Sequence, residues 1–231
     1  MNKGVMIAVA VAVAAALGAL AQRQLAAPTA TPGPAAAVAQ PDAEAAPPAE
    51  TITPAPAKIP DALPQFKLAD RDGKPRQLGD WKGRPLLVNY WATWCAPCRR
   101  EIPLLNQLRI DRKAQKLEVI GIAVDFREDV LKYAQETTIS YPLLIGEEDG
   151  LAAVQAMGMQ SAFPFSVFAD SQQRIVALKV GELHRDEAEL ILDRVAGVDA
   201  GTLPLAQARD EITEGLKELA TRRATAKPAS G

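Results

Sequence analysis

Runs of apolar residues alternate with amphipathic stretches along the middle of the chain. Two runs, LLVNYW at 86–91 and LEVIGIAV at 117–124, are almost wholly apolar and predict strands that are buried on both faces. A helical pattern follows each of them, and the alternation continues towards residue 197. Further strands are predicted at 141–145, 165–169 and 174–180, and helices at 129–137, 150–157, 186–196 and from Ala96 onward.

This alternation predicts an α/β fold with a central mixed sheet flanked by helices. The strands at 165–169 and 174–180 are separated only by a polar turn, which predicts an antiparallel pair at the edge of the sheet. An alternating polar and apolar stretch at 65–68, followed by a turn at Asp72-Gly73, precedes the first buried strand.

Two residues mark breaks in the helical patterns. Pro103 lacks a backbone N–H, so it is expected to kink the helix that begins near Ala96. Gly197 follows the stretch 186–196 directly and is expected to end that helix.

A last helical pattern lies between about Leu205 and Arg223. Its apolar side chains recur every three or four residues and form a narrow stripe, which predicts packing on the same domain or, alternatively, binding of a partner. The stripe consists of Leu205, Ala208, Ile212, Leu216 and Leu219. Residues after Arg223 are expected to be disordered.

The N-terminal stretch is typical of a targeting segment. Lys3 is followed by an uncharged run from Gly4 to Ala21, which as a helix would span roughly 27 Å, close to the thickness of a bilayer core. The end of the run, ALA at 19–21, also fits the cleavage pattern of a signal peptide. The segment is therefore an uncleaved anchor or a cleaved signal, and both place the rest of the chain outside the cytoplasm.

Residues 26–58 are rich in alanine and proline and almost free of large apolar side chains. Such a segment cannot bury enough surface to offset its ordering entropy, so it is expected to be a disordered tether or a passive leader. The predicted organisation is a signal anchor or signal peptide at 1–25, the tether at 26–58, a folded domain at 59–197 and a C-terminal helix and tail at 198–231.

Charge is close to balanced, with 26 Lys and Arg residues against 28 Asp and Glu residues. The basic surface typical of nucleic-acid-binding proteins is therefore not indicated, and no nucleic-acid partner is expected. The chain contains two cysteines, and both lie within four residues. They cannot join distant parts of the fold, which excludes a disulfide-rich secreted scaffold and leaves the sulfurs available for chemistry.

The cysteines belong to the motif WCAPC at 94–98, between a buried strand and a helix. Two intervening residues let the sulfurs of Cys95 and Cys98 meet across the first helical turn, so a disulfide can form and open without unfolding. Free N–H groups and the helix dipole stabilise a thiolate there, and Pro97 is compatible with a first turn. Cys95 is expected to be the exposed nucleophile with the lower pKa, and Cys98 the shielded resolving thiol.

Two other interpretations of the cysteine pair are weaker. Half of a zinc site would need two further Cys or His ligands, and the chain offers only His184, which is expected to lie at the surface. A structural disulfide would close too small a loop to add much stability. The sequence of strand, CxxC and helix favours redox chemistry.

The block VNYWATWCAPCRREIP at 88–103 resembles the thioredoxin superfamily and, within it, the TlpA/ResA-like thiol-disulfide oxidoreductases of bacterial envelopes. The resemblance extends over about 59–195. Residues 66–85 are similar to an N-terminal hairpin that this branch shares with peroxiredoxins, and 141–150 to an insertion before the last helix and strands. It implies a thioredoxin fold with an N-terminal hairpin extension and a C-terminal helix.

The resemblance also implies roles for single residues. Pro164 would be the cis-proline, packed against the disulfide and leaving backbone groups free for a substrate strand. Glu101 matches a helix glutamate that tunes the cysteines or relays a proton, the alternative being a solvated helix residue. Asn89 stands where ordinary thioredoxins carry a buried aspartate. Because an amide cannot take a proton, the role of proton acceptor shifts to Glu101.

Aromatic side chains surround the expected site. Phe163 and Phe165 bracket the proline where many relatives carry smaller residues, which predicts an apolar substrate groove. Trp94 and Pro97 are expected to contribute to the substrate-contact surface, whereas Trp91 is expected to belong to the core.

These features predict a reductase of protein disulfides that needs no metal or organic cofactor. The resemblance implies substrates of the cytochrome c maturation or copper-site assembly type and electrons from a membrane thiol reductant. The protein is expected to be a monomer in the bacterial cell envelope, at the periplasmic face of the inner membrane if anchored and in the periplasm if cleaved.

Three other functions are weighed against reduction. A disulfide oxidase or isomerase would use the same cysteines at a higher reduction potential. A non-enzymatic copper carrier would hold a cuprous ion between Cys95 and Cys98. A peroxidase is disfavoured because residues 89–95 do not reproduce the PxxxTxxC setting of its reactive cysteine.

Overall fold

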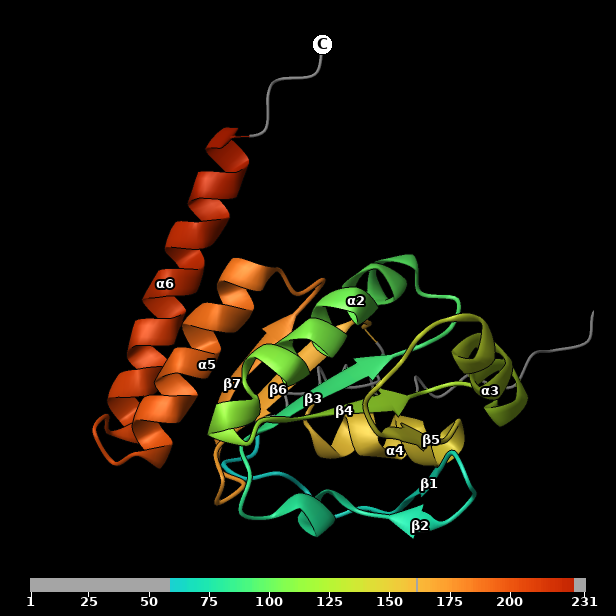
Figure 1. Ribbon diagram of the computed structural model, residues 1–231. Helices are drawn as coiled ribbons and strands as arrows, with labels where there is room; N and C mark the ends of the chain where they lie inside the picture. Colours follow the sequence, from blue (N-terminus) through green and yellow to red (C-terminus); the bar gives the residue numbers. More distant parts are fainter. Residues whose placement is uncertain (1–58, 161, 227–231) are drawn as a thin grey trace, which may run out of the picture. The chain divides into compact units, whose positions relative to one another are not determined.

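The computed structural model describes residues 59–160 and 162–226. The expectations for the targeting segment, for the tether at 26–58 and for residues 227–231 lie outside this range. The expected disorder after Arg223 is wrong for residues 224–226, which continue the last helix. The elements, in chain order, are β1 (Leu68–Asp70), β2 (Pro75–Arg76), η1 (Leu78–Trp81), β3 (Leu86–Trp91), α2 (Ala96–Asp111), η2 (Lys113–Gln115), β4 (Glu118–Ala123), α3 (Arg127–Glu136), β5 (Leu143–Ile145), α4 (Glu148–Ala156), β6 (Phe165–Ala169), β7 (Ile175–Val180), α5 (Arg185–Asp199) and α6 (Leu205–Ala226) (Figure 1).

A single mixed sheet connects all the strands, in the order β2-β1-β5-β4-β3-β6-β7. The central strands β3, β4 and β5 are parallel, with Val88 of β3 opposite Ile120 of β4. Strand β6 runs antiparallel to β3, and β7 pairs antiparallel with β6 at the edge. The predicted α/β class, the mixed sheet and the antiparallel edge pair are confirmed.

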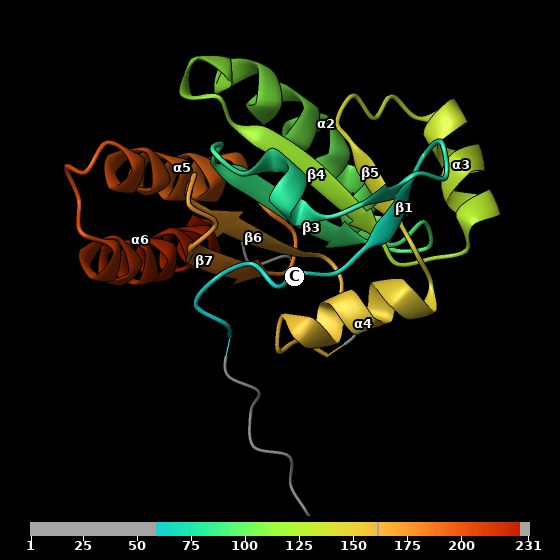
Figure 2. The same cartoon turned by 90° about the horizontal axis from the view of Figure 1, so that it is seen from below.

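The central strand β3 is buried along its whole length because both faces of the sheet are covered. Its side chains alternate between two apolar clusters. Leu87 and Trp91 pack with α2, α3 and α5 on one face, whereas Leu86, Val88 and Tyr90 pack with η1 and α4 on the other. Figure 2 shows α2 and α4 on opposite faces of the sheet. The expectation that Trp91 belongs to the core is confirmed.

The prediction that Gly197 ends its helix is wrong. Helix α5 continues to Asp199, and the left-handed residue that follows its end is Gly201, with φ of 69°. Gly197 is needed for close packing instead, because a Cβ atom there would lie 3.1 Å from the Cβ of Leu203 in the α5–α6 loop. Pro103 lies inside α2, and the helix continues past it to Asp111.

The C-terminal helix α6 packs on its own domain, which was the first of the two predicted possibilities. Ala208 and Ile212 of its apolar stripe are buried, and Leu205 and Leu216 pack against the same cluster as α2 and α5. Helix α6 lies alongside α5 in both views of the molecule (Figures 1 and 2).

Replacing Ile212 with alanine is expected to lower the free energy of unfolding by about 3 kcal/mol, because the substitution leaves a cavity in a packed cluster. Ile212 is 3% exposed. Urea denaturation checks this, with Thr213→Ala, one residue further on the exposed side of α6, as the matched control. Equal stabilities of the two variants would contradict the packing of α6 in solution.

None of the helices within residues 59–160 and 162–226 combines the length and the apolar character that a membrane crossing requires.

Candidate active site

The two cysteines lie where the central strand gives way to a helix. Cys95 is the N-cap of α2 and forms a disulfide with Cys98, across a Cα–Cα distance of 5.3 Å. The backbone N–H of Cys98 points at the sulfur of Cys95, with a nitrogen–sulfur distance of 3.3 Å. In the reduced protein, this N–H and the helix dipole would stabilise a thiolate on Cys95.

The exposure of the two sulfur-bearing residues follows the predicted order but not the predicted degree. Cys98 is fully buried and Cys95 is 4% exposed, so the expectation of an exposed Cys95 is wrong for the disulfide form. Both residues belong to the apolar cluster beneath α2, which explains the low exposure. Trp94 is 69% exposed, and Pro97, in the first turn of α2, is partly exposed.

The loop that leads into the motif is fixed by a buried carboxylate. One oxygen of Asp125, which follows β4, accepts hydrogen bonds from the backbone N–H and the hydroxyl of Thr93 at 2.9 and 2.5 Å. Its other oxygen accepts from the N–H of Phe126. Asp125 is 7% exposed. Through its hydrogen bonds to Thr93, this buried side chain links the ends of the parallel strands β3 and β4 next to Cys95.

Pro164 follows a cis peptide bond, as the resemblance implied. Its carbonyl oxygen accepts from the N–H of Gly181 at 2.8 Å. The ring of the preceding Phe163 meets the ring of Trp94 edge to face, with centroids 6.0 Å apart. The proline loop therefore reaches the motif through an aromatic contact.

Phe165 does not line the groove, and that part of the expectation is wrong. It is fully buried and stacks on Tyr90 of β3, with ring centroids 4.3 Å apart, in the cluster on the α4 side of the sheet. Phe163 is partly buried and stacks on Phe165. Phe165 therefore supports Phe163 from behind, and Phe163 with Trp94 forms the aromatic surface.

Glu101 is buried, with 2% exposure, which excludes the alternative of a solvated helix residue. Its Oε1 accepts from the side-chain amide of Asn89 at 2.7 Å, and its Oε2 accepts from the backbone N–H of Leu183 at 2.9 Å. The Asn89 amide also donates to the Ser166 hydroxyl at 3.1 Å. Glu101 lies on α2 one turn beyond Cys98, so the carboxylate is held between β3 and the loop after β7.

Burial raises the pKa of Glu101 to about 7, because removal from water disfavours the charged form. The hydrogen bonds from Leu183 and Asn89 oppose this effect, and Lys179 lowers the pKa further, whereas the negative charge of Glu182 raises it. A carboxyl group with this pKa changes its protonation state near neutral pH.

A protein-family model matches residues 59–181, and it describes the AhpC/TSA family. The match covers more than half of the chain and contains the strand, the cysteine motif and the proline loop. The chain belongs to this family.

Curated relatives of this AhpC/TSA-family protein are named as thiol-disulfide oxidoreductases or thioredoxin-like proteins. It is 28% identical over 133 residues to a thiol-disulfide oxidoreductase ResA of Bacillus cereus, which covers 57% of the chain and 75% of the relative. It is 31% identical over 134 residues to the thioredoxin-like protein YneN of Bacillus subtilis, covering 56% and 76%. The predicted resemblance is thereby confirmed.

Among solved structures, a thiol:disulfide interchange protein of the thioredoxin family from Chlorobium tepidum TLS is similar, with a TM-score of 0.51 and 28% identity. The similarity covers 62% of this chain and 97% of that one. The AhpC/TSA-family protein therefore has a thioredoxin fold, and with its Cys95–Cys98 pair it is a thiol-disulfide oxidoreductase of the thioredoxin type.

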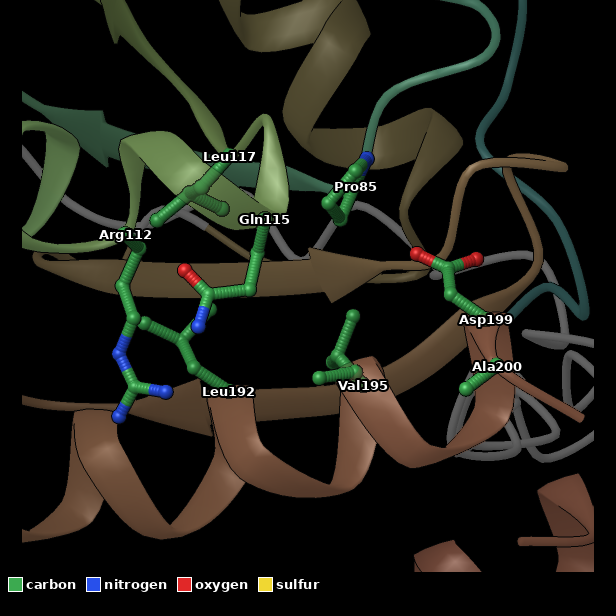
Figure 3. A pocket seen from close by; sticks show the side chains of 9 residues that line it. Pro85, Arg112, Gln115, Leu117, Leu192, Val195, Asp199 and Ala200 are labelled. Atoms are coloured by element: carbon green, nitrogen blue, oxygen red, sulfur yellow. The ribbon is translucent and has the colours of Figure 1, made fainter. Parts of the chain in front are cut away.

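The described residues 59–160 and 162–226 of the AhpC/TSA-family protein hold no group of three or more His, Cys, Asp or Glu residues that could bind a metal ion. A hollow of about 290 Å³ lies at the other end of the sheet, near the starts of β3 and β4. Its walls include Pro85, Leu117, Leu192 and Val195, with Asp199 at one end (Figure 3). It is separate from the cysteines, which follow the opposite end of β3.

Sequence reasoning missed three groups at the site of this AhpC/TSA-family protein. Asp125 could have been found from the sequence, because a carboxylate that directly follows the buried run at 117–124 lies at the same end of the sheet as the cysteine motif. Ser166 and the Leu183 amide carried no such signal, because only the folding of distant segments brings them to Glu101 and Asn89. His184 is exposed, as expected.

Proposed function

We infer that this protein is a reductase of protein disulfides that acts outside the cytoplasm. The observation that carries the proposal is the placement of Cys95 and Cys98 at the start of α2 with the buried carboxyl of Glu101 one turn further on. The pair can donate two electrons and Glu101 can accept a proton, so no metal or organic cofactor is required for the exchange.

The reaction proceeds in two balanced steps. The Cys95 thiolate attacks one sulfur of a substrate disulfide, so that a mixed disulfide forms and the second substrate sulfur leaves as a thiolate. Cys98 then gives its proton to the Glu101 carboxylate and attacks the Cys95 sulfur. The mixed disulfide breaks, the first substrate sulfur also leaves as a thiolate, and the Cys95–Cys98 disulfide forms. The protein loses two electrons and the substrate gains them.

The surface around Cys95 favours a protein substrate. Trp94 is exposed next to the cysteine, and its contact with Phe163 extends an apolar face towards the loop of Pro164. Such a face suits a substrate cysteine with apolar neighbours in an extended segment. We further propose that the substrates are of the cytochrome c maturation or copper-site assembly type and that a membrane thiol reductant supplies the electrons. The protein is proposed to be a monomer that is attached to the membrane through its N-terminal segment.

The reduction potential of the Cys95–Cys98 pair tests the direction of the reaction. We expect a value below about −150 mV, nearer the −270 mV of thioredoxin than the −120 mV of DsbA. Equilibration of the protein in dithiol buffers of known potential, with alkylation of free thiols and mass measurement, gives this value. Cys98→Ser, which cannot close the internal disulfide, supplies the background. A potential above about −150 mV would contradict the reductase and favour the oxidase.

A further inference from the structure

Arg223, near the end of α6, contacts two acidic side chains at the start of α5. Its Nη1 donates to Glu187 Oε1 at 2.9 Å, and its Nη2 donates to Asp186 Oδ1 at 3.2 Å. Glu187 is 3% exposed, and a buried carboxylate is costly without a charged partner. Both helices lie beyond residue 181, where the match to the family model ends.

The second oxygen of Glu187 holds the start of α5. It accepts from the backbone N–H of His184 at 3.0 Å and lies 3.7 Å from the Nζ of Lys179. The same Nζ donates to the carbonyl oxygens of Val180 and Glu182 at 2.8 and 3.4 Å. Both ends of the β7–α5 loop, residues 181–184, are therefore tied to one cluster around Glu187.

The middle of this loop reaches the redox site. The backbone N–H of Leu183, a buried residue, donates to Glu101 Oε2 at 2.9 Å. On the solvent side, both carboxylate oxygens of Glu182 accept from Arg100 Nε of α2 at 3.1 Å. A backbone donor can hold a carboxylate only while its loop is fixed, and the loop that carries Leu183 is tied to the cluster around Glu187 at both ends and to Arg100 on the solvent side.

We propose that Arg223 is a positioning residue for the redox site: through Glu187 it fixes the β7–α5 loop, whose Leu183 amide holds the Glu101 carboxylate. Arg223 touches neither cysteine. The inference rests on the proposed function only for the statement that Glu101 takes the proton of Cys98, and the coupling from α6 to Glu101 is independent of it.

The groups that act on Glu101 come from several elements. They are Asn89 of β3, Tyr141 before β5, Lys179 of β7, and Glu182 and Leu183 of the loop. Burial raises the pKa of Tyr141, so its hydroxyl stays neutral. The hydrogen bond from the Leu183 amide favours the ionised form of Glu101 and lowers its pKa. Loss of Arg223 weakens this hydrogen bond, so the pKa of Glu101 rises.

Carboxyl ¹³C titration of the oxidised full-length protein tests this coupling without any substrate. We expect the midpoint of Glu101, assigned from the spectrum of Glu101→Gln, to move to higher pH in Arg223→Ala. The Leu183 amide is expected to exchange its hydrogen about ten-fold faster. Arg223→Lys should restore both readouts in part, because it keeps the charge but not the forked geometry.

Glu211→Gln is the matched control. Its carboxylate pairs with Arg194 Nε at 3.2 Å and also joins α6 to α5, but Arg194 lies seven residues, roughly 10 Å, further along α5 than Glu187. Glu211→Gln should leave both readouts of Glu101 and Leu183 at their wild-type values. An unchanged midpoint in Arg223→Ala, or an equal change in Glu211→Gln, would overturn the proposal. If Arg223→Ala does not fold, Arg223→Lys takes its place, with a smaller shift of the Glu101 midpoint expected. An unchanged midpoint in Arg223→Lys, or an equal change in Glu211→Gln, would then overturn the proposal.

The two proposals can fail separately. Suppose that Arg223→Ala shifts the titration midpoint of Glu101, but Glu101→Gln leaves thiol exchange unchanged. This result would support the coupling between Arg223 and Glu101 and would count against the proposed function. If instead Arg223→Ala leaves the midpoint of Glu101 in place while Glu101→Gln slows thiol exchange, only the coupling between Arg223 and Glu101 would be overturned.

Discussion

Cys95→Ser is expected to lower the rate of thiol-disulfide exchange on the order of 10³-fold or more, because serine provides no thiolate at neutral pH. Cys98→Ser is expected to react once and then remain attached to its substrate. The difference follows from the N-terminus of α2: the Cys98 N–H points at the Cys95 sulfur, whereas Cys98 itself is fully buried.

Single-turnover reduction of a disulfide-bonded protein, with non-reducing electrophoresis of the products, measures both effects. The Cys98→Ser protein should accumulate mixed disulfides through Cys95, and the captured proteins would identify the physiological substrates. The double variant, with both cysteines replaced, is the control for capture that does not depend on these sulfurs. Capture by Cys95→Ser but not by Cys98→Ser would reverse the assignment of the nucleophile.

The fold could be predicted from the sequence where burial on both faces left a strong signal. The runs at 86–91 and 117–124 became β3 and β4, because helices cover both sides of these strands. Gly197 was misread because a glycine signals both a helix end and a close contact, and the sequence does not say which one applies. The contact with Leu203 decided it.

The site could be predicted as far as the cysteine motif and the resemblance reached. The burial of Phe165 follows from strand alternation, because its neighbour Ser166 faces Asn89 and the α2 side of the sheet. The environment of Glu101 could not be predicted, because the Leu183 amide lies 82 residues further along the chain. Long-range hydrogen bonds of backbone groups leave no trace in residue type.

Glu101→Gln is expected to slow the attack of Cys98 on the mixed disulfide at pH 8 by about 10²-fold, the range of a lost general base. The wild-type carboxyl has a pKa raised to about 7 by burial, so it is ionised and able to accept a proton above that pH and protonated below it. The wild-type rate should therefore rise with pH through about 7, and this rise should be absent in the variant. Near pH 5.5 the two proteins should differ little.

Reduced protein mixed with an aromatic disulfide reagent isolates this step, because the second release of the coloured thiol reports the attack of Cys98. Glu182→Gln is the matched control: its carboxylate lies next to Leu183 and its charge raises the pKa of Glu101. Removing that charge should move the midpoint to lower pH without abolishing it. A midpoint that stays in place in Glu101→Gln would assign the titration to another group, and the buried carboxyl would then serve only to hold Asn89 and the β7–α5 loop.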